Sequence, residues 1–137
     1  MKQATRDDAH RWIAEAENDI KDAEMLLRHE AYYPLCRLTY LAAAKAIRGL
    51  LLGMGQPFPE QADLAALSQQ VSLVEPTLGV LTQSLDPLQR FAPPAPTAGP
   101  EATPLPPPLY SREAAKRAIA LVRQAVAEVK RSLTALS

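Results

Sequence analysis

The stretch that most restricts the fold is residues 34–53, which are apolar almost all the way round a helix. Its large apolar side chains are Leu35, Leu38, Tyr40, Leu41, Ile47, Leu50 and Leu51, and small residues lie between them at Ala42, Ala43, Ala44 and Ala46. A helix of this kind is stable in water only when other elements cover it, and its alanines let those neighbours approach closely. We therefore predict the central helix of a bundle, ended by Gly53 and Gly55.

Amphipathic helices are expected on both sides of this segment. The first begins at a capping box formed by Thr5 and Asp8 and ends near Glu30. Its apolar residues recur every three to four positions: Ala9, Trp12, Ile13, Ala16, Ile20, Ala23 and Leu27. The last helix of the chain is predicted to start at Ser111, which is a good N-cap residue. Its apolar seam is Ala115, Ile119, Val122, Val126, Val129, Leu133 and Leu136.

Shorter helices are predicted over residues 61–70 and 76–91, where Gly79 and Pro87 make the second irregular. Residues 92–108 contain eight prolines in seventeen positions, which is incompatible with helix or sheet and predicts a polyproline-like linker or arm. The fold class expected from these segments is all-α. It is an up-and-down bundle of four to five helices in a single domain, residues 1–137, with a long proline-rich loop before the last helix.

Charge and cysteine usage limit the function. The formal net charge is zero, so nothing favours nonspecific nucleic-acid binding. Cys36 is the only cysteine, which excludes an intramolecular disulfide and a thiolate metal cluster. The charged first residues lack a signal-peptide pattern, and the most apolar run, residues 41–52, is too short to span a bilayer. We therefore expect a cytoplasmic protein with no membrane segment, no metal site and no cofactor.

One basic row crosses the otherwise apolar central segment. Arg37 and Arg48 are eleven residues apart, which places them within about 20° on a helix, and Lys45 lies about 60° from Arg48. These side chains either reach out to pair with Glu15, Asp19 or Asp22 of the acidic first helix, or bind a nucleotide phosphate or an acidic partner. Arg90 is a further candidate for such a cluster, although an arginine at a helix end also suits the helix dipole.

The particular residue strings resemble the HEPN domain family, the higher eukaryotes and prokaryotes nucleotide-binding domain. They are WIAEAENDI over residues 12–20 followed by Ala23, and AAAKAIRGLL over residues 42–51 preceded by Cys36. Arg90-Phe91 followed by Pro93 is similar to the family's R-Y-P element before the final helix. The resemblance covers nearly the whole chain and implies the helical fold.

Active ribonucleases of that family carry an arginine, four to six further residues and then a histidine. This chain has only His10 and His29, and neither has an arginine at that distance upstream. The resemblance therefore implies no catalytic residues here. The alternative is a degenerate HEPN ribonuclease acting on RNA, for which Arg37, Arg48, Arg90 and His29 are the remaining candidates.

The leading hypothesis is a non-catalytic, homodimeric helical module. The resemblance implies a nucleotidyltransferase as its protein partner, in a bacterial toxin–antitoxin-like pair, or else a bound nucleotide. The candidate binding residues for either ligand are Arg37, Lys45, Arg48 and Arg90.

Overall fold

The computed structural model describes residues 3–93 and 110–136. Five α-helices are present in these residues: α1 (Gln3–Arg28), α2 (Tyr32–Gly53), α3 (Leu64–Val74), α4 (Gly79–Ser84) and α5 (Arg112–Leu136). Two 3₁₀-helices accompany them, η1 (Pro76–Leu78) and η2 (Asp86–Phe91). With helices and no strand in the described residues, the all-α bundle expected from the sequence is confirmed.

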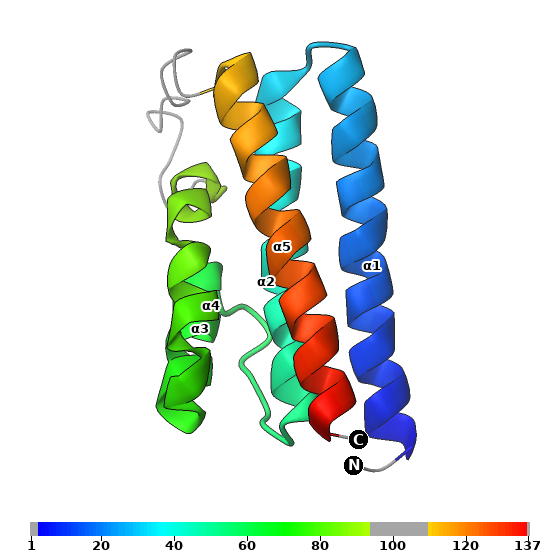
Figure 1. Cartoon of the computed structure of the whole chain (residues 1–137), viewed down its shortest axis with the longest axis vertical. Helices are drawn as coiled ribbons and strands as arrows, with labels where there is room; N and C mark the ends of the chain where they lie inside the picture. Colours follow the sequence, from blue (N-terminus) through cyan, green and yellow to red (C-terminus); the bar gives the residue numbers. More distant parts are fainter. Residues whose placement is uncertain (1–2, 94–109, 137) are drawn as a thin grey trace.

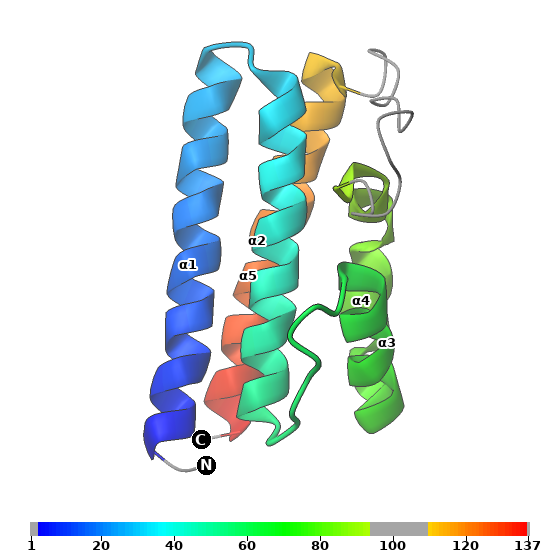
Figure 2. The same ribbon diagram turned by 180° about the vertical axis from the view of Figure 1, so that it is seen from behind.

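Three long helices, α1, α2 and α5, lie side by side, and the segment from α3 to η2 forms a shorter second layer (Figure 1). The views from both sides show that α2 and α5 run in the same direction, opposite to α1 (Figure 2). The α2 helix contacts α1, α5, α3 and η2, as a central helix should. Its buried apolar residues are Leu35, Cys36, Tyr40, Ala42, Ala43, Ala44, Ala46, Ile47, Leu50 and Leu51.

The outer helices bury one seam each. On α5 every predicted seam residue from Ala115 to Leu133 is buried, whereas Leu136 is exposed. On α1 the buried residues are Ala9, Ile13, Ala16, Ile20 and Ala23, while Trp12 and Leu27 are half-buried. The backbone N–H of Ala114 donates to Ser111 Oγ at 3.1 Å, which confirms the predicted N-cap.

Several predicted boundaries are wrong. The α1 helix begins at Gln3, so Thr5 lies inside it rather than at its N-cap, whereas its end at Arg28 agrees with the end predicted near Glu30. The α2 helix begins at Tyr32, two residues before Pro34. Proline fits there because the first backbone N–H groups of a helix have no intrahelical acceptor.

The first of the two predicted short helices is also displaced, because α3 starts at Leu64 instead of residue 61. Asp63 caps it by accepting from the Ala66 N–H, and the Leu64 N–H donates to the Tyr40 hydroxyl at 3.1 Å. The predicted helix over 76–91 is broken into η1, α4 and η2, in keeping with Pro76 and Pro87 near the starts of the 3₁₀ turns. The predicted proline-rich linker lies almost entirely outside the described residues.

The two glycines at the end of α2 have different roles. Gly55 adopts φ +72° and its N–H donates to Leu52 O, while the next N–H donates to Leu51 O. This pair of bonds is the Schellman motif that ends a helix, so the prediction holds for Gly55. Gly53 instead remains helical and makes room for Leu133, since a Cβ there would collide with the Leu133 side chain.

Candidate functional site

The basic residues predicted as one row on α2 lie in three separate environments. Arg37 and Arg48 share a helical face, but eleven residues of helix separate them by about 16 Å along the axis. Among the described residues, Arg37 contacts Tyr33, Lys45 contacts α1, and Arg48 contacts the loop before α3. The structure therefore does not gather the predicted candidates into a single cluster.

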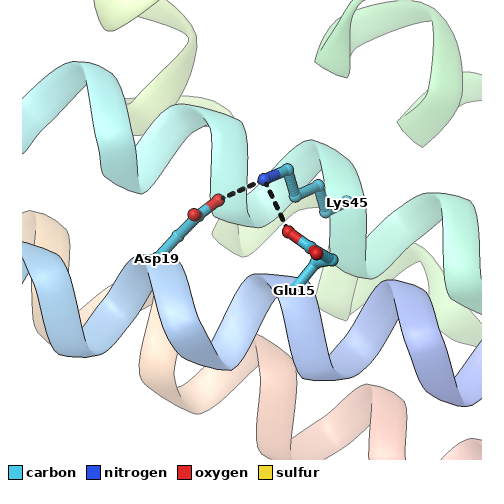
Figure 3. Close-up of polar contacts among 3 residues, drawn as sticks. All are labelled: Glu15, Asp19 and Lys45. Atoms are coloured by element: carbon cyan, nitrogen blue, oxygen red, sulfur yellow. Dashed lines mark hydrogen bonds and ion pairs between the residues drawn. The ribbon is translucent and has the colours of Figure 1, made fainter.

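Lys45 is paired inside the molecule (Figure 3). Its Nζ lies 2.9 Å from Asp19 Oδ2 and 3.5 Å from Glu15 Oε2, both on α1. Asp19 is only 8% exposed, and its Oδ2 accepts no hydrogen bond in the described part of the chain. The ion pair with the Lys45 ammonium therefore balances the negative charge of this buried carboxylate. The expectation that Lys45 pairs with the acidic first helix is confirmed.

Arg48 is held by aromatic rings rather than by an acid. Its Cζ lies 5.6 Å from the Trp12 ring centre and 5.9 Å from that of Phe58, and these two rings meet edge to face at 6.2 Å. One of its terminal N–H groups donates to Ala62 O at 2.8 Å. Burial lowers the pKa of the guanidinium, and nearby Tyr40 partly offsets that effect. Arg48 thus ties the loop after α2 to α1.

Arg37 and Arg90 lie at the other end of α2, in what we call the arginine–tyrosine cluster: Tyr33, Arg37, Arg90, Phe91 and Tyr110. Arg37 donates to the Tyr33 hydroxyl, and its Cζ lies 5.4 Å from the Tyr33 ring centre. The Tyr33 and Tyr110 ring centres are 4.7 Å apart, and those of Tyr110 and Phe91 are 6.0 Å apart. Arg90 Cζ lies 5.7 Å from the Phe91 ring centre. A continuous series of ring contacts therefore connects the two arginines.

Cys36 is fully buried, as expected for a core residue. Burial raises the pKa of the thiol to about 11, and the positive charge of Arg90 partly counteracts it. A thiol in this state is protonated at neutral pH and is a poor nucleophile, so a reactive cysteine is disfavoured.

A groove of about 510 Å³ runs along the outside of α1 and α2. Apolar parts of its wall come from Trp12 and Leu52, and charges of both signs line it through Arg11, Lys45 and Glu15. Beside it on α2 lies Leu41, which is 43% exposed although most of that helix is buried. Within the described residues, this groove and Leu41 therefore leave part of the α1–α2 face open to solvent.

The two histidines lie near opposite ends of α1, nineteen residues and so about 28 Å of helix apart. Both are exposed, and within residues 3–93 and 110–136 neither side chain forms a hydrogen bond with an arginine. The same residues contain no group of three or more His, Cys, Asp or Glu side chains arranged to hold a metal ion. Nor do they contain a helix long and apolar enough to cross a membrane.

The sequence patterns did not identify the aromatic partners of the arginines. Phe58, Phe91 and Tyr110 lie far from Arg48 and Arg37 along the chain, so no local spacing connects them. One signal was present, since Arg90-Phe91 and Tyr110 stand on either side of the proline-rich segment. Elements flanking a long loop often come together at its base, and here they do.

Comparison with known proteins agrees with this architecture. The HEPN domain profile matches residues 9–132. The crystal structure of an archaeal HEPN homologue has the same fold, with a TM-score of 0.70 and 22% sequence identity, over 97% of this chain and 99% of that chain. A search of curated proteins finds none that matches. With its fold established and the profile covering most of its length, this chain belongs to the HEPN domain family.

Proposed function

We propose that this HEPN domain is a non-catalytic module that forms a homodimer through the open face of α2. That face is the row Leu41, Lys45, Arg48 and Leu52, which share one side of the helix at three- and four-residue spacing. The observation that supports the proposal most is Leu41. It lies in the middle of the most buried helix of the bundle, yet 43% of it faces solvent. Burying it against a second copy would complete the covering of α2.

The charges along this face suit contact with an identical copy. A two-fold interface places a surface patch against itself, so it must be self-complementary. The groove beside Leu41 has acidic residues on α1, such as Asp8 and Glu15, and basic residues in Arg11 and Lys45. Trp12 and Leu52 supply apolar surface among these charges. Protein interfaces likewise combine apolar groups with charged groups.

Light scattering during size-exclusion chromatography tests this proposal at micromolar protein concentration. The wild type should elute as a dimer, and Leu41→Asp as a folded monomer, because a carboxylate in an apolar contact weakens association by at least about a hundredfold. The matched control is Leu73→Asp on α3, where the leucine is 76% exposed on another face. A monomeric wild type, or a monomer produced by Leu73→Asp alone, would contradict the proposal.

The non-catalytic part of the proposal rests on spacing, because neither His10 nor His29 follows an arginine at the distance that the family's ribonucleases use. Incubation with RNA should give no cleavage above that of a buffer control, and His29→Ala and Arg48→Ala should not differ from wild type. Cleavage abolished by either substitution would support the degenerate ribonuclease instead.

The family resemblance adds a nucleotidyltransferase as the expected protein partner, in a toxin–antitoxin-like pair. The two purified proteins should then co-elute as one complex, and the interaction should be measurable by calorimetry. Separate elution at micromolar concentrations would remove this part of the proposal without affecting the homodimer.

A further inference from the structure

A polar pocket of about 200 Å³ lies between α3, α4 and η2, in the second layer of the fold (Figure 2). Ser68 and Thr82 are 6% and 4% exposed and form its floor, whereas its other polar residues lie nearer the surface. In the part of the chain that the structure describes, no lysine or arginine lines this pocket. Apart from Ala65, every lining residue is polar: Ser68, Gln69, Ser72, Thr82, Gln83, Asp86 and Gln89.

The hydroxyl of Ser68 is buried and has no hydrogen-bond partner among the described residues. Other helical hydroxyls in this layer do have one, since those of Thr82 and Ser84 each donate to the backbone carbonyl three residues earlier. Unpaired buried hydroxyls are rare in folded proteins because they cost free energy. A ligand that reaches the floor of the pocket would therefore give Ser68 its missing partner.

The other polar groups of the pocket are arranged to accept hydrogen bonds. The Ser72 and Thr82 hydroxyls lie 2.9 Å apart, and Thr82 gives its proton to Gly79 O at 3.0 Å. Ser72 is thus the donor between them and keeps a lone pair free. Gln89 Nε2 donates to Asp86 Oδ1 at 3.2 Å, which orients the carboxylate and leaves its second oxygen for a ligand. The pocket therefore offers oxygen acceptors and one full negative charge.

The charge of the surrounding layer favours a cation. Residues 56–93 hold four acidic side chains, Glu60, Asp63, Glu75 and Asp86, and one basic side chain, Arg90. None of the four acids forms an ion pair within the described residues. Arg90 lines a different, smaller pocket together with residues of α5. The negative potential of this layer is therefore available to attract a positively charged ligand.

We propose that this pocket binds the primary ammonium group of a small amine. An ammonium carries one positive charge and three N–H donors, which match the oxygens of Asp86, Ser72 and Ser68 as acceptors. The pocket is smaller than the roughly 300–1,000 Å³ typical of sites for drug-sized ligands, so a short alkylamine fits it better than a nucleotide does. The site shares no residue with the open face of α2 and does not depend on dimerisation.

NMR titration of the full chain with butylamine tests the site, in about 150 mM sodium chloride so that exposed charges are largely screened. Millimolar butylamine should shift the backbone amide signals of residues 65–72 and 82–89 and leave those of α1 unchanged. Two matched compounds each lack one property of the ligand, since 1-butanol has no charge and tetramethylammonium has no N–H donor. Both should bind at least about tenfold more weakly than butylamine.

Variants locate the site. Asp86→Asn should weaken butylamine binding at least about tenfold, whereas Glu75→Gln removes an equal charge outside the pocket and should bind as wild type does. Ser68→Ala should weaken binding about threefold without lowering the melting temperature, because the hydroxyl has no partner in the described fold. Ser84→Ala, outside the pocket, should bind normally. Leu41→Asp should also bind normally, which separates this site from the dimer proposal. Circular dichroism checks that each variant is folded.

Four results would overturn the site. The first two are no shifts at millimolar butylamine, and 1-butanol or tetramethylammonium binding as tightly as butylamine. The third is an equal loss for Glu75→Gln and Asp86→Asn, which would mean that overall charge, and not this pocket, attracts the amine. The fourth is a lower melting temperature for Ser68→Ala with unchanged binding, which would mean that this hydroxyl serves the fold alone.

Discussion

The middle of α2 and its N-terminal end carry similar cations in two different settings. In the middle, Lys45 lies against α1 and meets Asp19, so its charge is part of the helix packing. At the N-terminal end, Arg37 meets Tyr33 and, through the rings, Arg90, with no carboxylate close by in the described residues. The comparison teaches that the opposing element, and not the basic residue itself, decides whether a cation pairs with an acid or contacts an aromatic ring.

The largest expected effect comes from forcing α1 away from the middle of α2. A Cβ at Gly49 would lie 3.0 Å from Ala9 O and 3.2 Å from Ile13 Cδ1. Gly49→Leu should therefore lower the free energy of unfolding by about 3 kcal/mol, measured by urea denaturation. The control is Gly79→Ala, which has nothing within 4 Å and should be neutral or stabilising by up to about 1 kcal/mol. Equal effects would mean that the helices do not approach closely here.

The next largest effect is expected from removing Lys45, the cation that pairs with Asp19. Lys45→Met leaves Asp19 buried without its cation and should cost about 2 kcal/mol of unfolding free energy. The double substitution Lys45→Met with Asp19→Leu should recover part of that loss. Lys130→Met breaks the exposed pair with Glu17 at 3.1 Å and should cost less than about 1 kcal/mol. If both single variants lose the same stability, the Asp19 pair is no stronger than a surface pair.

A smaller difference is expected between the two arginines of α2. Arg48→Met removes the bond to Ala62 O and the contacts with Trp12 and Phe58, so it should cost about 1 kcal/mol. Arg37→Met removes one exposed contact within the helix and should cost less than about 0.5 kcal/mol. Thermal unfolding measures both. The reverse order would mean that Arg37, and not Arg48, is the arginine of α2 that stabilises the fold.

The last effect is absent at neutral pH and concerns Cys36. A thiol pKa raised from 9.0 to about 11 means that the folded state holds its proton more tightly than the unfolded state. This contribution to stability is complete below pH 9.0 and is lost as the pH rises towards 11, so Cys36→Ala should lose less stability over that range. Arg90→Gln should raise the thiol pKa further, as followed by thiolate absorbance. An unchanged pKa would place Arg90 too far away to act.

The spacing of apolar residues predicted the helices well, because the residues that a helix buries recur every three to four positions along that one helix. For this reason the sequence predicts the buried seam of α5 and the buried face of α2. Helix starts were less predictable, because they depend on partners elsewhere in the chain. The start of α3 at Leu64 involves the Tyr40 hydroxyl, twenty-four residues away.

The candidate site was predictable only in part. The sequence indicated Arg37, Lys45, Arg48 and Arg90, but not which of them share a surface. Arg37 and Arg48 were expected together because they lie at nearly the same angle around the helix. They are separate in the structure because they are far apart along the helix axis and contact different residues. The rings that surround them come from other elements, so helical spacing carries no information about those contacts.

By itself, the sequence determined an all-α bundle around one apolar helix and a chain without the arginine–histidine spacing of the family's ribonucleases. These properties follow from patterns within single segments, where hydrophobic spacing and residue order act locally. Only the tertiary structure decided that Asp19 compensates Lys45, that Trp12 and Phe58 hold Arg48, and that Tyr110 links Arg37 to Arg90. The reason is physical: charge compensation and ring contact depend on distance in space, which helix packing sets.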